Sequence, residues 1–122
     1  MKLVFIFLFS FILLSGEAKA VDAILTWTDN SGNSTTVNDQ EDGFKVERKL
    51  NAGNYSVLTT VGTNIVTVTD TTLVQGFTEN NYCYRLAGFN SAGVSGYSNE
   101  ACKLVPAIPQ TIPIPASNLV IK

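Results

Sequence analysis

The chain has 122 residues, with eight Lys or Arg, ten Asp or Glu and no His, and it carries a formal net charge of −2 at neutral pH. A chain without histidine lacks the most common general base and the most common metal-ligating side chain. The slight acidic excess provides no basic footprint for nucleic acid or anionic lipid, and neither a glycine-rich phosphate loop nor a P-loop lysine occurs. We therefore expect no enzymatic activity, no cofactor, no metal site and no nucleic-acid partner.

Residues 1–20 have the pattern of a secretory signal. Lys2 precedes an unbroken apolar run over residues 3–14, and Ala18 and Ala20 supply the small side chains that a signal-peptidase site requires. The run is shorter than the roughly 20 residues that a membrane-spanning helix needs, and an uncleaved anchor is the alternative. We expect cleavage before Val21, secretion to the periplasm or the medium, and no membrane contact afterwards.

The mature part is predicted to be one small domain. Removal of residues 1–20 takes two of the eight basic residues and one of the ten acidic ones, which leaves six and nine. The remaining chain of about a hundred residues suffices for one core but not for two. It shows no helical period, it is rich in Thr, Val and Asn, and turn signals recur about every eight to twelve residues. This pattern predicts an all-β sandwich.

The first predicted strand covers residues 21–28. Ala23, Leu25 and Trp27 alternate along it, which places them on the inward face. A solvent-exposed, ligand-stacking role for Trp27 is the alternative. Residues 29–42 follow as a long polar loop whose carboxylate and amide oxygens suit calcium, but their spacing lacks the order of an EF-hand. We therefore expect a solvated loop.

Three further strands are expected before the last hairpin. Phe44 and Val46 alternate with charged residues in the first of them. After these strands comes a predicted connection in which Leu73 and Phe77 close the bottom of the core. The expected strands lie around residues 44–46 and over 55–61 and 65–69, the turns lie at 51–54 and 62–64, and the connection covers 70–80.

Residues 81–102 predict an antiparallel hairpin that turns at 90–93. Its first strand places one set of alternating large side chains in the core, and its second strand is expected to run from residue 97 to 101. With these strands, the predicted core consists of Leu25, Trp27, Phe44, Val46, Val68, Leu73, Tyr82, Tyr84 and Leu86.

Cys83 and Cys102 are predicted to form a disulfide. In a hairpin that turns in the middle of residues 90–95, the numbers of opposed residues sum to about 185, which puts the two cysteines opposite each other. In an oxidising compartment such a pair forms a disulfide. By closing a loop in the unfolded chain, this bond stabilises the folded protein by about 3 kcal/mol. A redox-active pair is the alternative, but the C-x-x-C spacing is lacking.

The hairpin resembles the last two strands of a fibronectin type III domain. The resemblance rests on Tyr82, Tyr84, Arg85, Leu86, Asn90, Gly93, Ser95 and Ser98, and it extends back through residues 43–48 and 25–28. It covers about eighty residues, 23–102, and it implies an immunoglobulin-like fibronectin type III β-sandwich of about seven strands. It further implies that Tyr82 pins the strand corner. Because this sandwich hosts unrelated roles, the resemblance names no ligand.

The end of the chain differs from the rest. All four prolines lie in residues 104–115, which predicts an extended spacer, and residues 116–122 form a strand-like tail. Type III domains usually open with a proline-flanked strand beside the tryptophan strand, and here the segment from Pro115 to Ile121 resembles that strand, displaced. Three arrangements are open: the tail fills the vacant edge of its own domain, it fills that of a neighbouring copy, or a second domain begins there.

The resemblance implies that the loop after the tryptophan strand and the loop of the last hairpin emerge at the same pole. Loops on a rigid sandwich are common recognition sites. We expect a secreted, non-enzymatic module that binds an extracellular protein or glycan there. The alternatives are a structural subunit that assembles by donating its tail, and an accessory module of a secreted hydrolase. The candidate loop residues are Asn30, Asn33, Asp39, Asp42, Asn90 and Tyr97.

Overall fold

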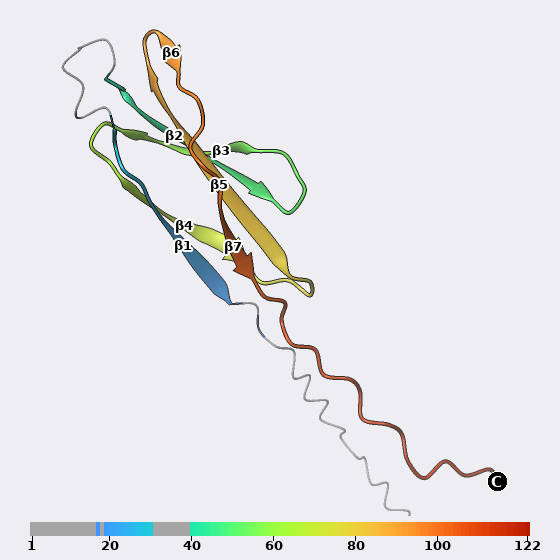
Figure 1. The fold of residues 1–122 in the computed structure, drawn as a ribbon. Coiled ribbons are helices and arrows are strands. Elements are labelled where there is room, and N and C mark those ends of the chain that lie inside the picture. Colours follow the sequence, from blue (N-terminus) through green and yellow to red (C-terminus); the bar gives the residue numbers. More distant parts are fainter. Residues whose placement is uncertain (1–16, 18, 31–39) are drawn as a thin grey trace, which may run out of the picture.

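The computed structural model describes residues 17, 19–30 and 40–122. These residues contain seven strands and no helix, arranged in two sheets (Figure 1). The expected all-β architecture is therefore confirmed. The candidate residues Asn33 and Asp39 and nearly all of the predicted signal lie outside the described residues. The strands are β1 (Ala20–Thr26), β2 (Gly43–Leu50), β3 (Ser56–Gly62), β4 (Thr67–Val74), β5 (Asn80–Asn90), β6 (Gly93–Val94) and β7 (Ala101–Val105).

The two sheets differ in size. Within the described part of the chain β1 pairs only with β4, while the larger sheet has the order β3-β2-β5-β6, with β7 also paired to β5. All pairs are antiparallel. Asn51 and Asn64 adopt left-handed backbone conformations, with φ angles of 51° and 62°, at the two turns that the sequence predicted. Asparagine tolerates this conformation, which explains why these turns were recognisable.

The core lies between the sheets. Leu73 and Val105 are fully buried, and Ala23, Tyr82 and Tyr84 complete the cluster. The predicted core residues Phe44 and Val46 are also buried, whereas Leu25, Trp27, Val68 and Leu86 are half-buried.

β4 is longer than predicted. A strand over residues 65–69 and a connection from Asp70 were expected, but the strand runs from Thr67 to Val74. One residue of β1 there opposes two of β4, since Val21 pairs with Leu73 and Ala23 with Asp70, so β4 carries a bulge. The bulge allows both Asp70 and Leu73 to face inward.

The prediction that Phe77 closes the bottom of the core is wrong. Its side chain is 75% exposed. The pole is closed instead by Val105 and Ile108, which are 0% and 8% exposed. The Ile108 N–H donates to the Gly76 carbonyl at 2.9 Å, which fastens the chain at this pole after β7 ends.

The second strand of the last hairpin is interrupted. It was expected at residues 97–101, but 95–100 form no strand and pairing resumes in β7. Two serine side chains stand in for main-chain acceptors, because the Gly88 N–H donates to Ser95 Oγ at 2.9 Å and the Leu86 N–H donates to Ser98 Oγ at 3.0 Å.

The predicted disulfide is present. Cys83 pairs with Cys102 across β5 and β7, and the register of this part of the hairpin is the expected one. Cys83 is buried although it faces away from the inter-sheet core. The bond ties β7, and with it the core residue Val105, to the longest strand of the domain.

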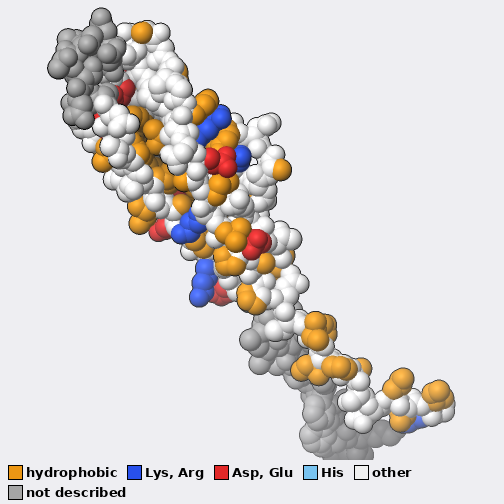
Figure 2. Space-filling model, in the orientation of Figure 1, with side chains coloured by type: hydrophobic (Ala, Val, Ile, Leu, Met, Phe, Trp, Pro, Cys, Tyr) orange, Lys and Arg blue, Asp and Glu red, His pale blue; other side chains and the backbone are white. Residues whose placement is uncertain are grey.

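Residues 109–122 form no strand and every one of them is exposed. Figure 1 shows this tail running away from the sandwich beyond the end of β7, and Figure 2 shows hydrophobic side chains spaced along it. Leu119 and Ile121 are 94% and 98% exposed. The arrangement in which the tail folds back on its own domain is therefore not the one observed.

Candidate functional site

A groove lined by both apolar and polar side chains lies beside β1, where the smaller sheet ends. Its volume is about 480 Å³. One wall carries Ala23, Leu25 and Trp27, which are the alternate, inward-facing residues of the first strand and its end. The opposite wall comes from the larger sheet and the segment before β7. It includes Tyr84 and Leu86, together with the polar side chains of Arg85, Ser98, Asn99 and Lys103. The groove therefore opens between the two layers of the sandwich, against its core.

The open edge of β1 borders this groove. The Trp27 N–H donates to the Val66 carbonyl at 3.1 Å, toward β4. Because main-chain groups alternate in direction along an antiparallel strand, those of Ile24 and Thr26 point to the opposite edge. Among the described residues no strand pairs there. The Ile24 side chain is 73% exposed. An edge with unpaired N–H and C=O groups is a template for another strand.

Trp27 is the aromatic residue in the β1 wall of the groove. Its ring packs edge-on against Phe44, with 5.5 Å between ring centroids and 66° between planes. Its Nε1–H is buried and has no acceptor among the described residues. A buried donor without a partner costs free energy.

A second groove of about 860 Å³ lies at the pole of the loops. The structure brings three of the candidate loop residues to it, namely Asn30, Asn90 and Tyr97. Asp42 is exposed near the same pole, and its N–H donates to the Phe89 carbonyl at 2.7 Å. Asn90 has a structural role as well, since its Oδ1 accepts from the Ala92 N–H and its Nδ2 donates to the Gln40 carbonyl.

Tyr97 is 53% exposed, as expected for a loop aromatic, but one face of its ring is occupied. The Arg85 guanidinium lies 3.6 Å from the Tyr97 ring centroid and 3.9 Å from that of Tyr55. Arg85 also donates to Glu47 at 2.7 Å. This stack holds the irregular segment 95–100 on the outer face of β5, which leaves Tyr97 little freedom to meet a ligand.

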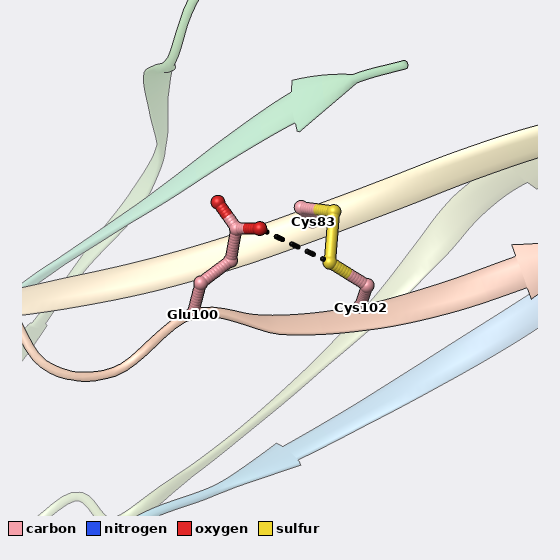
Figure 3. A group of neighbouring side chains, drawn as sticks. All are labelled: Cys83, Glu100 and Cys102. Atoms are coloured by element: carbon pink, nitrogen blue, oxygen red, sulfur yellow. Dashed lines mark hydrogen bonds between the residues drawn. A yellow bond between two sulfur atoms is a disulfide. The ribbon is translucent and has the colours of Figure 1, made fainter. Parts of the chain in front are cut away.

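Cys83, Glu100 and Cys102 form a group with the spacing of metal ligands (Figure 3). The two sulfur atoms are bonded to each other, with an S–S distance of 2.07 Å. Glu100 Oε1 lies 3.5 Å from Cys102 Sγ, a contact in which the sulfur has no proton to donate. Metal binding needs thiolates, so the group is a structural one. Glu100 pairs with Lys49 at 2.7 Å, and the Tyr55 hydroxyl donates to it.

Sequence reasoning missed the polar centre of the domain. Asp70, on β4, is 3% exposed and accepts from Arg48 of β2 at 2.7 Å and from the Tyr84 hydroxyl of β5 at 2.9 Å. Thr72 donates to its other oxygen through both N–H and Oγ1. Burial by itself raises the pKa of Asp70, but the hydrogen bonds from Thr72, Arg48 and Tyr84 together lower it below its usual value. This carboxylate therefore joins the two sheets.

Burial, together with the hydrogen bond to Asp70, raises the pKa of Tyr84 well above its usual range, so its hydroxyl remains a donor. An aspartate within an alternating Thr/Val stretch is the signal that was available for this centre. Asp70 was instead placed at the start of the connection over residues 70–80; aspartate is depleted in strands.

Comparison with protein-family models, with curated proteins and with solved structures finds no match for this chain. Within the described residues there is no helix of the length and apolarity that crossing a membrane requires. A small, disulfide-bonded β domain is compatible with an extracellular location.

Proposed function

We propose that this chain is a secreted, non-enzymatic module of the fibronectin type III kind, and that it binds an extended, apolar stretch of polypeptide along the open edge of β1. The observation that carries the proposal is this edge together with the groove beside it. Outward-facing main-chain groups at Ile24 and Thr26 adjoin a groove of about 480 Å³, one wall of which carries Leu25 and Trp27. Main-chain pairing supplies affinity in such complexes, and pockets for alternate side chains supply specificity.

The strand arrangement supports the type III assignment. The resemblance places the missing first strand beside the tryptophan strand, and β1 is an edge strand of a two-stranded sheet. The Tyr82 hydroxyl accepts from the Val74 N–H at 3.5 Å, eight residues upstream. A tyrosine that bonds back to the main chain near a strand corner is the role that the resemblance implied for this residue.

Of the two partner classes expected from the sequence, we favour a protein strand over a glycan. Unpaired N–H and C=O groups along a strand edge are complementary to the same groups of another extended chain. The apolar wall formed by Leu25 and Trp27 suits side chains that alternate with a period of two.

The test is peptide binding measured by fluorescence anisotropy on the exported chain. A labelled decapeptide, Lys-(Thr-Val)4-Lys, should bind with a dissociation constant on the order of 10–100 µM, and Lys-(Thr-Pro)4-Lys should not bind, because proline removes the donors. Ile24→Pro removes an outward N–H and should weaken binding at least ~10-fold.

Ile24→Thr is the matched control, since it keeps the N–H and alters only an exposed side chain. Its affinity should stay within ~3-fold of the original. Equal binding of the two decapeptides, or an Ile24→Pro variant that folds and binds Lys-(Thr-Val)4-Lys as before, would contradict the proposed function.

A further inference from the structure

We propose that the segment that docks along β1 is the tail of a second copy of this chain, residues 115–121, so that copies join head to tail. This inference rests on the proposed function, because it names the partner of the same groove. Donor and acceptor are different surfaces of the molecule, and contacts of that kind produce open chains unless the rotation closes a ring.

The tail has the composition of a buried strand but is fully exposed. Residues 104–121 contain no charged side chain, so the tail itself would carry no charge into the groove. Near its end Leu119, Val120 and Ile121 are 94%, 71% and 98% exposed, and Figure 2 shows the tail standing clear of the domain. Contiguous exposed apolar side chains mark interaction sites.

The length and period of the tail match the groove. Residues 116–121 contain no proline, and in an extended strand of six residues they span about 20 Å, against about 23 Å for the seven residues of β1. Leu119 and Ile121 then share one face with a spacing of two residues. Leu25 and Trp27 line the groove with the same spacing.

The tail is poorly placed to serve its own copy. Ile108 is fastened to Gly76 at the pole where β1 begins, since Val74 pairs with Ala20 there. The eight residues from Ile108 to Ala116 span about 25 Å in a polyproline conformation, slightly more than β1. A tail that ran directly along its own β1 would place three prolines against the edge and carry residues 116–121 past its end.

A tail from another copy has no such constraint. The free tail is not extended throughout, because Asn118 has a φ of 57°. Docking therefore requires one residue to leave the left-handed region, which asparagine visits at small cost.

The test is complementation between two variants of the exported full chain, measured by sedimentation velocity from about 5 to 200 µM. Leu119→Asp combined with Ile121→Asp removes the donor and keeps the edge. Ile24→Pro blocks the edge and keeps the donor. The original chain should form concentration-dependent oligomers, each variant alone should associate at least ~10-fold more weakly, and a mixture of the two should form one-to-one dimers.

The matched control is Ile112→Asp combined with Ile114→Asp, which places the same charges in the exposed spacer and should leave association unchanged. If Ile24→Pro fails to fold, a second experiment tests the inference. A synthetic peptide of residues 115–122 is added to the unmodified chain. It should dissociate the oligomers and change the emission of Trp27, the single tryptophan, which lines the groove.

Two outcomes would overturn the inference. One is a chain that is monomeric throughout this range, whether its tail docks on its own β1 or stays free. The other is association that Ile24→Pro leaves intact in a folded protein, which indicates non-specific apolar contact. If the donor-deficient variant still binds Lys-(Thr-Val)4-Lys through Ile24, the proposed function stands and only the partner is wrong.

Discussion

At the scale of single residues, Asp70 joins the two sheets through its hydrogen bonds. It lies on the two-stranded sheet, while Arg48 and Tyr84, which donate to it, lie on the five-stranded one. The side chain of Asp70 is 1% exposed and that of Arg48 is 28% exposed, so the ion pair is only partly screened by solvent. Removing one partner of such a pair leaves the other charge buried without its partner. The loss of stability is then larger than the stability that the intact pair provides relative to an apolar replacement.

We expect Asp70→Asn to lower the free energy of unfolding at pH 7 by about 3 kcal/mol. The folded protein lowers the pKa of Asp70, so the carboxylate stabilises the fold fully above its unfolded pKa, about 3.9. This contribution is lost as the pH falls through the lower, folded value. Urea unfolding at pH 7 and pH 2 should therefore show a large gap between the two proteins at pH 7 and a smaller one at pH 2.

Asp22→Asn is the control for this change, since Asp22 also lies on a strand but is exposed. Its effect should be within about 0.5 kcal/mol at either pH. A loss at Asp70→Asn that is below about 1 kcal/mol at pH 7, or that does not shrink in acid, would show that the carboxylate does not hold the sheets together.

At the scale of elements, the hairpin of β5 and β7 shows what the sequence can and cannot predict. The register that brings Cys83 opposite Cys102 follows from the turn position and the period of two. The interruption at 95–100 does not, because it depends on Ser95 and Ser98 reaching across to β5 and on Arg85 stacking with Tyr97. No local pattern in the sequence indicates that these residues contact one another.

β4 and the groove were also only partly predictable from the sequence. Asp70 was placed at the start of a connection and not within a strand, because the residues that make its burial tolerable, Arg48 and Tyr84, lie far away in the chain. Phe77 was assigned to the core by hydrophobicity alone, while Val105 and Ile108 fill that place. The open edge of β1 was predicted from the sequence. The groove beside it was not, because it depends on how far apart the two sheets pack.

The disulfide is the element-scale prediction. Replacing both cysteines, Cys83→Ala with Cys102→Ala, should lower the free energy of unfolding by about 3 kcal/mol, because the bond closes a loop between residues 19 apart and so restricts the unfolded chain. Urea unfolding with and without dithiothreitol provides the measurement. The reductant should destabilise the original protein by a similar amount and leave the double variant unchanged. A double variant as stable as the original would contradict this account.

At the scale of the whole molecule, the chain divides at Ile108 into a packed part and a tail. Ile108 is 8% exposed and Val105 is 0% exposed, whereas residues 109–122 are all exposed. Burial ends at Ile108, within the segment predicted as a spacer, so the tail beyond it contributes little to the fold of its own copy. Its apolar residues are then available for contacts between copies, which depend on concentration in a way that folding of a single domain does not.

Two truncations separate these contributions. A chain that ends at Ile108 should unfold with a free energy within about 0.5 kcal/mol of the original at low micromolar concentration, because only exposed residues are removed. A chain that ends at Leu104 should lose more than about 3 kcal/mol, because it also lacks two buried aliphatic side chains. Thermal unfolding at about 5 and 200 µM is the measurement. If tails dock between copies, the melting temperature of the original chain rises over this range while that of the chain ending at Ile108 stays constant. A tail that stabilises its own copy instead would make the shorter chain less stable at both concentrations, by the same amount.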